Sequence, residues 1–151
     1  MLFHEKSSLP DCSMNRRKAR EYALQILFQR EFAGTVRDVL PPDDFWSDKD
    51  RGERDVLKGF AEELVRGTIE NIGEIDRAIQ EAAEHWDVKR MAAVDRNILR
   101  FAVYEILYRK DIPSAVTMNE ALEIAKKYSS LESAPFINGL LDKIARDAGK
   151  K

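Results

Sequence analysis

The stretch from Ile98 to Tyr108 is apolar on almost every side, with only Arg100 and Glu105 as polar residues. Asp95 stands just before it and Pro113 shortly after it, which is typical of a helix bounded at both ends. A helix that is apolar nearly all round cannot lie on a surface, so other elements must surround it. We therefore predict a central buried helix of about a dozen residues.

A first helix is expected to begin at Asn15, because apolar residues then recur at the helical spacing of three and four positions. Its buried face comprises Ala19, Tyr22, Ala23, Ile26 and Leu27. Gly34 is expected to end it, since glycine is favoured just after a helix. Residues 1–14 lack this periodicity and contain Pro10, so we expect a mobile N-terminal tail there.

The helical pattern returns near Arg51 and continues to Ala83. Gly67 and Gly73 interrupt it, and each is a weak helix former, by about 1 kcal/mol relative to alanine. One long kinked helix, or two helices that break near Asn71, would both satisfy the pattern.

Two more helices are expected after the central one. Thr117 and Glu120 have the spacing of a capping box, which predicts a helix start at that point. Ser133 is expected to cap the last helix, with Pro135 tolerated in its first turn. Gly139 within that helix suggests close backbone packing against a neighbour.

Together these elements predict the all-α fold class. No segment has the alternating pattern of a strand. We expect one compact helical domain over residues 15–147, with about six or seven helices in two packed sub-bundles around the central helix. A chain of 151 residues is long enough to bury a core of this kind.

Net charge, cysteine count and the length of apolar runs limit the functional classes that fit this sequence. The net charge is only −2, so binding to a nucleic acid would need a local basic patch. The single cysteine, Cys12, excludes an internal disulfide and is consistent with a reducing compartment. No apolar run approaches the roughly 20 residues that span a membrane, and the first residues lack a signal-peptide core. We expect a cytoplasmic protein without a membrane partner.

Enzyme, metal and helix-turn-helix signatures are weak. The sequence has no glycine-rich phosphate loop, and its cysteine and histidine residues lack metal-ligand spacing. Glu81, Glu84 and His85 lie in one stretch, but without the Glu-x-x-His pairs of a di-metal bundle. The segment 135–145 is mostly apolar and has no basic residue before Lys143, unlike a groove-reading helix. We expect no enzyme activity, no metal and no cofactor.

A basic cluster near the start of the chain is a candidate binding site. It comprises Arg16, Arg17, Lys18 and Arg20. At the start of a helix the macrodipole disfavours cations by about 0.3–1 kcal/mol each, so a surface chosen only for solubility would favour acidic residues there. The three arginines also lie outside the predicted buried helix face that contains Ala19, so we expect them to be accessible. Contact with an RNA phosphate backbone and a merely solvated helix start are both consistent with this pattern.

Four segments, in order, resemble the bacterial transcription antitermination protein NusB family. The segment 16–28 (RRKAREYALQILF) is similar to the opening helix of that family, and 95–107 (DRNILRFAVYEIL) is similar to its central helix. The segment from Ile112-Pro113 through NEALEIAKKY to residue 128 resembles the next part, and 136–144 (FINGLLDKI) resembles the last helix.

This resemblance implies an all-α RNA-binding protein without catalytic activity. Its expected partners are boxA-type RNA, notably from ribosomal RNA operons, and the small-subunit ribosomal protein that acts as Nus factor E. Together they would help RNA polymerase resist termination. The resemblance implies RNA contact by the basic cluster and by the start of the last helix, and partner contact by Asp95. The RNA-contacting residues so implied are Arg16, Arg17, Lys18, Arg20, Glu132, Ser133 and Phe136.

Several alternatives stay open at this stage. Phe136 is either a core aromatic or a base-stacking residue. Asp95 is either an interface residue or an acidic residue favoured by a helix start. The whole chain has an alternative function as a non-enzymatic protein–protein interaction module without RNA binding, in which the basic cluster is incidental.

Overall fold

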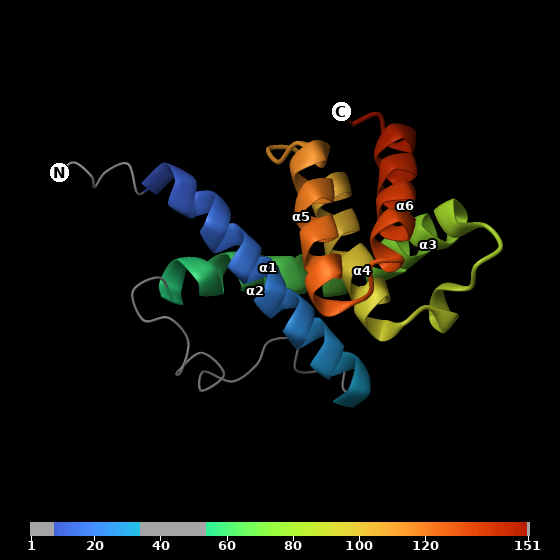
Figure 1. Cartoon of the computed structure of the whole chain (residues 1–151), viewed down its shortest axis with the longest axis horizontal. Helices are drawn as coiled ribbons and strands as arrows, with labels where there is room; N and C mark the ends of the chain where they lie inside the picture. Colours follow the sequence, from blue (N-terminus) through green and yellow to red (C-terminus); the bar gives the residue numbers. More distant parts are fainter. Residues whose placement is uncertain (1–7, 34–53, 151) are drawn as a thin grey trace. The chain divides into compact units, whose positions relative to one another are not determined.

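The computed structural model describes residues 8–33 and 54–150, and these form six α-helices and one short 3-10 helix without strands. This confirms the predicted all-α class. The helices are α1 (Ser8–Ala33), α2 (Arg54–Glu70), α3 (Ile72–Ala83), η3 (Val88–Arg90), α4 (Ala93–Tyr108), α5 (Ser114–Tyr128) and α6 (Ser133–Asp147), as drawn in Figure 1.

The chain divides into two compact units, residues 1–66 and 67–151. Helix α2 runs across the boundary, so its last turn belongs to the second unit. In the described ranges, no helix has both the length and the apolar character that a membrane crossing requires.

Helix α1 starts earlier than the sequence pattern indicated. We predicted a start at Asn15, but the helix begins at Ser8, so residues 8–14 are helical. Pro10 falls within the first turn, where its missing N–H has no intrahelical partner to lose, so it does not interrupt the helix. The predicted helix start at Asn15 is therefore wrong, whereas the mobility of residues 1–14 stays a prediction. Residues 1–7 and Gly34 lie outside the described residues.

The pattern around Gly67 and Gly73 resolves into two helices. Helix α2 ends at Glu70 and α3 begins at Ile72, with Asn71 between them. The Asn71 side-chain amide donates to the Gly67 carbonyl at 2.8 Å, and this bond satisfies a carbonyl at the end of α2.

Helix α4 is the buried centre of the second unit, as predicted. It contacts α3, α5 and α6, and Figure 1 shows these helices gathered around it. Six of its apolar side chains have almost no solvent exposure: Ile98, Leu99, Phe101, Ala102, Val103 and Ile106. Arg100 reaches α3, where its Nε and Nη2 atoms donate to the two carboxylate oxygens of Asp76 at 2.9 Å each.

The predicted capping box at the start of α5 is wrong, because the helix begins at Ser114. Thr117 instead donates its hydroxyl to the Glu105 carboxylate of α4 at 2.7 Å, and both side chains are buried. A buried carboxylate requires such a partner, so Thr117 stabilises the contact between helices α4 and α5.

At the end of α4, the Lys150 ammonium donates to the carbonyls of Glu105 and Arg109. Burial lowers the pKa of Lys150.

The close helix contact predicted at Gly139 is also wrong. A Cβ atom placed on Gly139 would meet nothing within 4 Å. The close approach is instead at Gly67, where a Cβ would overlap with Cε1 of Tyr104. Glycine is needed at Gly67 because the ring occupies the position of a side chain.

Candidate nucleic-acid interface

The basic cluster lies on α1, where its four side chains differ in exposure. Lys18 is exposed, Arg16 and Arg17 are half-buried, and Arg20 has only 2% of its surface accessible. The prediction that Arg20 is accessible was therefore wrong. Leu24 and Leu27 follow Arg20 at the spacing of one helix face, and both are buried, so Arg20 lies on that buried face.

Arg16 and Arg20 both approach Phe60 of α2 within the first unit. Their guanidinium carbons lie 4.5 Å and 5.3 Å from the centroid of the Phe60 ring, which is cation–π geometry. The two arginines are one helical turn apart, so a single ring can contact both. Arg20 therefore has a packing role, whereas Arg17 and Lys18 point elsewhere on the helix.

The early start of α1 removes one of our arguments for the cluster. Arg16 lies about two turns into the helix, and the macrodipole acts mainly within the first turn. The cations are therefore not placed against the dipole. What supports a role in binding is the exposure of Lys18 and the partial exposure of Arg16 and Arg17.

The start of α6 and the start of α4 are joined by a serine–aspartate cluster in the second unit. Ser129 donates its hydroxyl to Oδ1 of Asp95 at 2.5 Å, and Ser133 donates to Oδ2 of Asp95 at 2.8 Å. The Ser133 hydroxyl proton is thereby used, so Ser130 is the donor in the 3.0 Å contact between the Ser130 and Ser133 hydroxyls. Asp95 therefore holds the α5–α6 turn against α4.

This cluster changes the interpretation of two predicted site residues. Ser133 is the first residue of α6 and not its cap, and its hydroxyl faces Asp95. Asp95 is 9% exposed, with both carboxylate oxygens engaged. Glu132, next to Ser133, is exposed. The sequence analysis missed the link between Asp95 and Ser133 because they are far apart along the chain.

Phe136 in the first turn of α6 is half-buried, which is compatible with both the core and the base-stacking alternatives. Its ring lies 6.0 Å from the ring of Trp86, centroid to centroid, with the two planes tilted by 58°. Trp86 is exposed and lies just after the end of α3.

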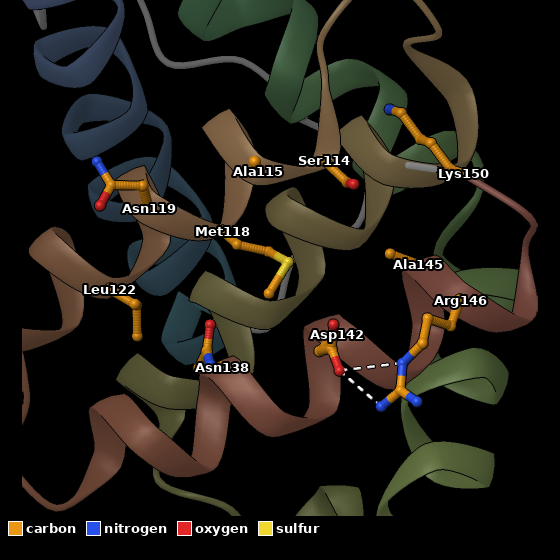
Figure 2. Close-up of a pocket in the computed structure, with 10 residues that line it drawn as sticks. All are labelled: Ser114, Ala115, Met118, Asn119, Leu122, Asn138, Asp142, Ala145, Arg146 and Lys150. Carbon is orange, nitrogen blue, oxygen red and sulfur yellow. Dashed lines mark hydrogen bonds and ion pairs between the residues drawn. The ribbon is translucent and has the colours of Figure 1, made fainter.

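A groove of about 500 Å³ lies between α5 and α6 in the second unit (Figure 2). Met118 and Leu122 line it from α5, and the Asp142–Arg146 ion pair of α6 lies across from them, with its shortest distance 2.6 Å. Asn138, also on α6, contributes its amide. The groove contains none of the predicted site residues, so it is separate from the candidate interface.

Comparison with known proteins places the chain in a family. The sequence model of the NusB family matches residues 17–146. The chain belongs to the NusB family. It is 49% identical to the transcription antitermination protein NusB of Thermodesulfovibrio yellowstonii over 141 residues, which cover 89% of this chain and 93% of the relative. The matched range of the NusB family model begins at Arg17, within the basic cluster.

Solved NusB structures have the same fold. The T. maritima NusB structure superposes with a TM-score of 0.70 at 38% identity, and the match covers 87% of this chain and 91% of that one. A structure described as antitermination factors NusB and NusE in complex with dsRNA has a TM-score of 0.70 at 24% identity, covering 89% and 98%. At that lower identity, the second comparison supports the fold alone.

Proposed function

We propose that this protein is an RNA-binding transcription antitermination factor. Membership of the NusB family carries this proposal, because the similar T. yellowstonii protein is named for transcription antitermination. A similar fold occurs in a complex of NusB and NusE with double-stranded RNA. The protein would act as a binding adaptor in the cytoplasm and not as an enzyme.

The proposed ligands are boxA-type RNA and the small-subunit ribosomal protein that acts as Nus factor E. The complex of these components would join the antitermination complex on RNA polymerase. We assign phosphate contact to Arg16, Arg17 and Lys18, because cations on one exposed part of a helix neutralise a phosphate backbone.

The remaining proposed residues act differently from the basic cluster. Arg20 supports the cluster through Phe60 and does not contact phosphate itself. Glu132 and Phe136 are proposed to approach RNA at the start of α6. Asp95 is proposed to influence the partner and the RNA through the position of Ser133, since its carboxylate is already engaged.

A salt-dependence measurement tests the role of the basic cluster. The affinity for a boxA-type RNA, with the ribosomal partner present, is measured over a range of salt concentrations. For single strands, the log–log slope changes by about 0.7 for each phosphate contact. Replacing Arg17 and Lys18 together by alanine should make the slope shallower by about 1.4, if each contacts one phosphate.

The matched control replaces two exposed cations at the end of α5, Lys126 and Lys127, by alanine. This control changes the net charge by the same amount but leaves α1 intact, so its slope should stay near that of the unsubstituted protein. Equal slopes and affinities for all three proteins would remove the cluster from the RNA interface. That outcome would favour the alternative, a protein-interaction module whose basic cluster is incidental.

A further inference from the structure

Trp86 is a large aromatic residue with 55% of its surface exposed, in the connection between α3 and α4. Tryptophan buries a large area when it finds a partner, and it is enriched at binding sites for that reason. A single exposed apolar residue needs no explanation by itself. What sets Trp86 apart is the way its backbone is held and what its ring contacts.

The backbone around Trp86 is fixed by one amide side chain of α3. Gln80 donates from Nε2 to the Trp86 carbonyl at 2.9 Å, and its Oε1 accepts from the Val88 N–H at 3.0 Å. The Asp87 carboxylate accepts from the Lys89 N–H at 3.0 Å. The Trp86 N–H also donates to the Ala83 carbonyl at 3.1 Å, so both backbone polar groups of Trp86 are bonded and little backbone freedom is left to lose when a ligand binds.

A buried guanidinium fixes the other end of the same connection. Nη1 of Arg96 donates to the carbonyls of Met91, Val88 and Lys89 at 2.7, 3.2 and 3.3 Å. Arg96 itself is only 9% exposed. The connection therefore combines a rigid backbone with an exposed aromatic side chain, which is how a preorganised contact residue is built.

The ring of Trp86 lies against Phe136, so the two rings form one aromatic surface at the start of α6. Lys89 and Arg90 follow in the same connection, and both are exposed. The nearby Glu84 carboxylate accepts a hydrogen bond from Lys143 at 2.9 Å, and this bond holds the pKa of Glu84 below its ordinary value. The negative charge of Glu84 is thus partly compensated next to the aromatic surface.

We propose that Trp86, together with Phe136, forms a base-stacking surface for single-stranded RNA, and that Lys89 and Arg90 contact the adjoining phosphates. This inference rests on the proposed RNA-binding function and extends the contact proposed at the start of α6 to Trp86, Lys89 and Arg90. Exposed rings beside cations are the combination that binds single strands, because bases stack on rings and cations neutralise phosphates. A protein partner would not require the two exposed cations that follow Trp86 in the same connection.

The test uses the full-length protein and a fluorescently labelled 12-nucleotide boxA-type RNA. Affinity is measured by anisotropy for Trp86→Ala and Trp86→Phe. The matched control is Tyr128→Ala, which removes an aromatic residue of 44% exposure from α5. The alanine variant should bind roughly ten- to hundredfold more weakly, as expected for the loss of one stacked base. Phenylalanine should restore most of the affinity, and the Tyr128 variant should bind like the unsubstituted protein.

Two further measurements distinguish base stacking by Trp86 from a purely structural role of this residue. With Trp46, the other tryptophan of the chain, replaced by phenylalanine, the fluorescence of Trp86 should be quenched by RNA with the same midpoint as the anisotropy. The salt slope of Trp86→Ala should equal that of the unsubstituted protein, since stacking releases no counterions. Replacing Lys89 and Arg90 together by alanine should make the slope shallower by about 1.4.

The outcomes distinguish this inference from the proposed function. If Trp86→Ala binds RNA within twofold of the unsubstituted protein while the Arg17 and Lys18 variant binds weakly, the stacking surface is wrong and RNA binding stands. If Trp86→Ala loses only its affinity for the ribosomal partner, the surface belongs to a protein interface and the inference is overturned. If the unsubstituted protein fails to bind the RNA, both the proposed function and this inference fail.

Discussion

Replacing Gly67 by alanine introduces one methyl group where α2 closely approaches Tyr104 of α4. The new Cβ would lie well inside van der Waals contact with Cε1 and Cζ of Tyr104. The Tyr104 ring stacks on Tyr108, with 5.7 Å between centroids, so moving it disturbs that contact as well. Either the ring or the end of α2 must therefore shift.

The change in unfolding free energy caused by Gly67→Ala follows from two opposing effects. Overpacking of this kind costs about 1–3 kcal/mol, whereas alanine in place of glycine within a helix contributes about 1 kcal/mol. The net loss of unfolding free energy should be about 0–2 kcal/mol. Gly139→Ala is the matched control, because its Cβ meets nothing within 4 Å. That substitution should stabilise the protein by about 0.5–1 kcal/mol.

The assay is equilibrium urea unfolding followed by far-UV circular dichroism, with free energies compared at equal m-values. A double variant, Gly67→Ala with Tyr104→Leu, adds a test of the contact itself. Because the smaller side chain makes room for the methyl group, the double variant should be more stable than the sum of the single effects by about 1–3 kcal/mol.

Two results would refute this reasoning. If Gly67→Ala stabilises the protein as much as Gly139→Ala does, the approach of Tyr104 to α2 is not close in solution. If the double variant is additive within about 0.5 kcal/mol, the destabilisation arises elsewhere than in the Tyr104 contact.

Three further predictions concern the second unit and its surroundings. Leu99→Ala should cost about 2–5 kcal/mol in urea unfolding because Leu99 is fully buried, whereas Val56→Ala, at 61% exposure, should change stability by less than about 0.5 kcal/mol. Asp95→Ala should cost about 1.5–3 kcal/mol by thermal or urea unfolding, since it removes a charged acceptor from two serine hydroxyls, and an unchanged stability would show that the cluster is not formed. Lys143→Ala should raise the pKa of Glu84 toward its ordinary value in an NMR pH titration. The stabilisation from this pair is fully present above the unfolded pKa of about 4.3 and is lost as pH falls through the lower folded pKa; an unmoved titration would contradict the ion pair.

Local pattern was a good guide to the helices and a poorer guide to their ends. Helix α4 was predicted because its apolar residues leave no polar face. Its neighbour α5 begins at Ser114, directly after Pro113, and Thr117 forms a hydrogen bond with Glu105 of α4 instead of capping the helix. Capping residues and interhelical donors have the same side chains, so the residue type alone does not distinguish them.

For the candidate site too, some features could be predicted from local sequence pattern and others depended on contacts between distant segments. The basic cluster and the start of the last helix were both chosen from the residues and the family resemblance. Burial of Arg20 was open to prediction, because Leu24 and Leu27 follow it on one helix face. The contact between Trp86 and Phe136 was not, since these residues belong to elements distant in the chain.

By itself, the sequence determined the all-helical class, the central buried helix and the resemblance to the NusB family. These follow from the spacing of apolar residues and from local motifs, which are properties of neighbouring positions. Only the tertiary structure decided that Asp95 holds Ser133, that Trp86 lies against Phe136, and that Gly67 and not Gly139 is the close contact. Those features depend on which helix faces meet, and side-chain packing between distant segments sets that choice.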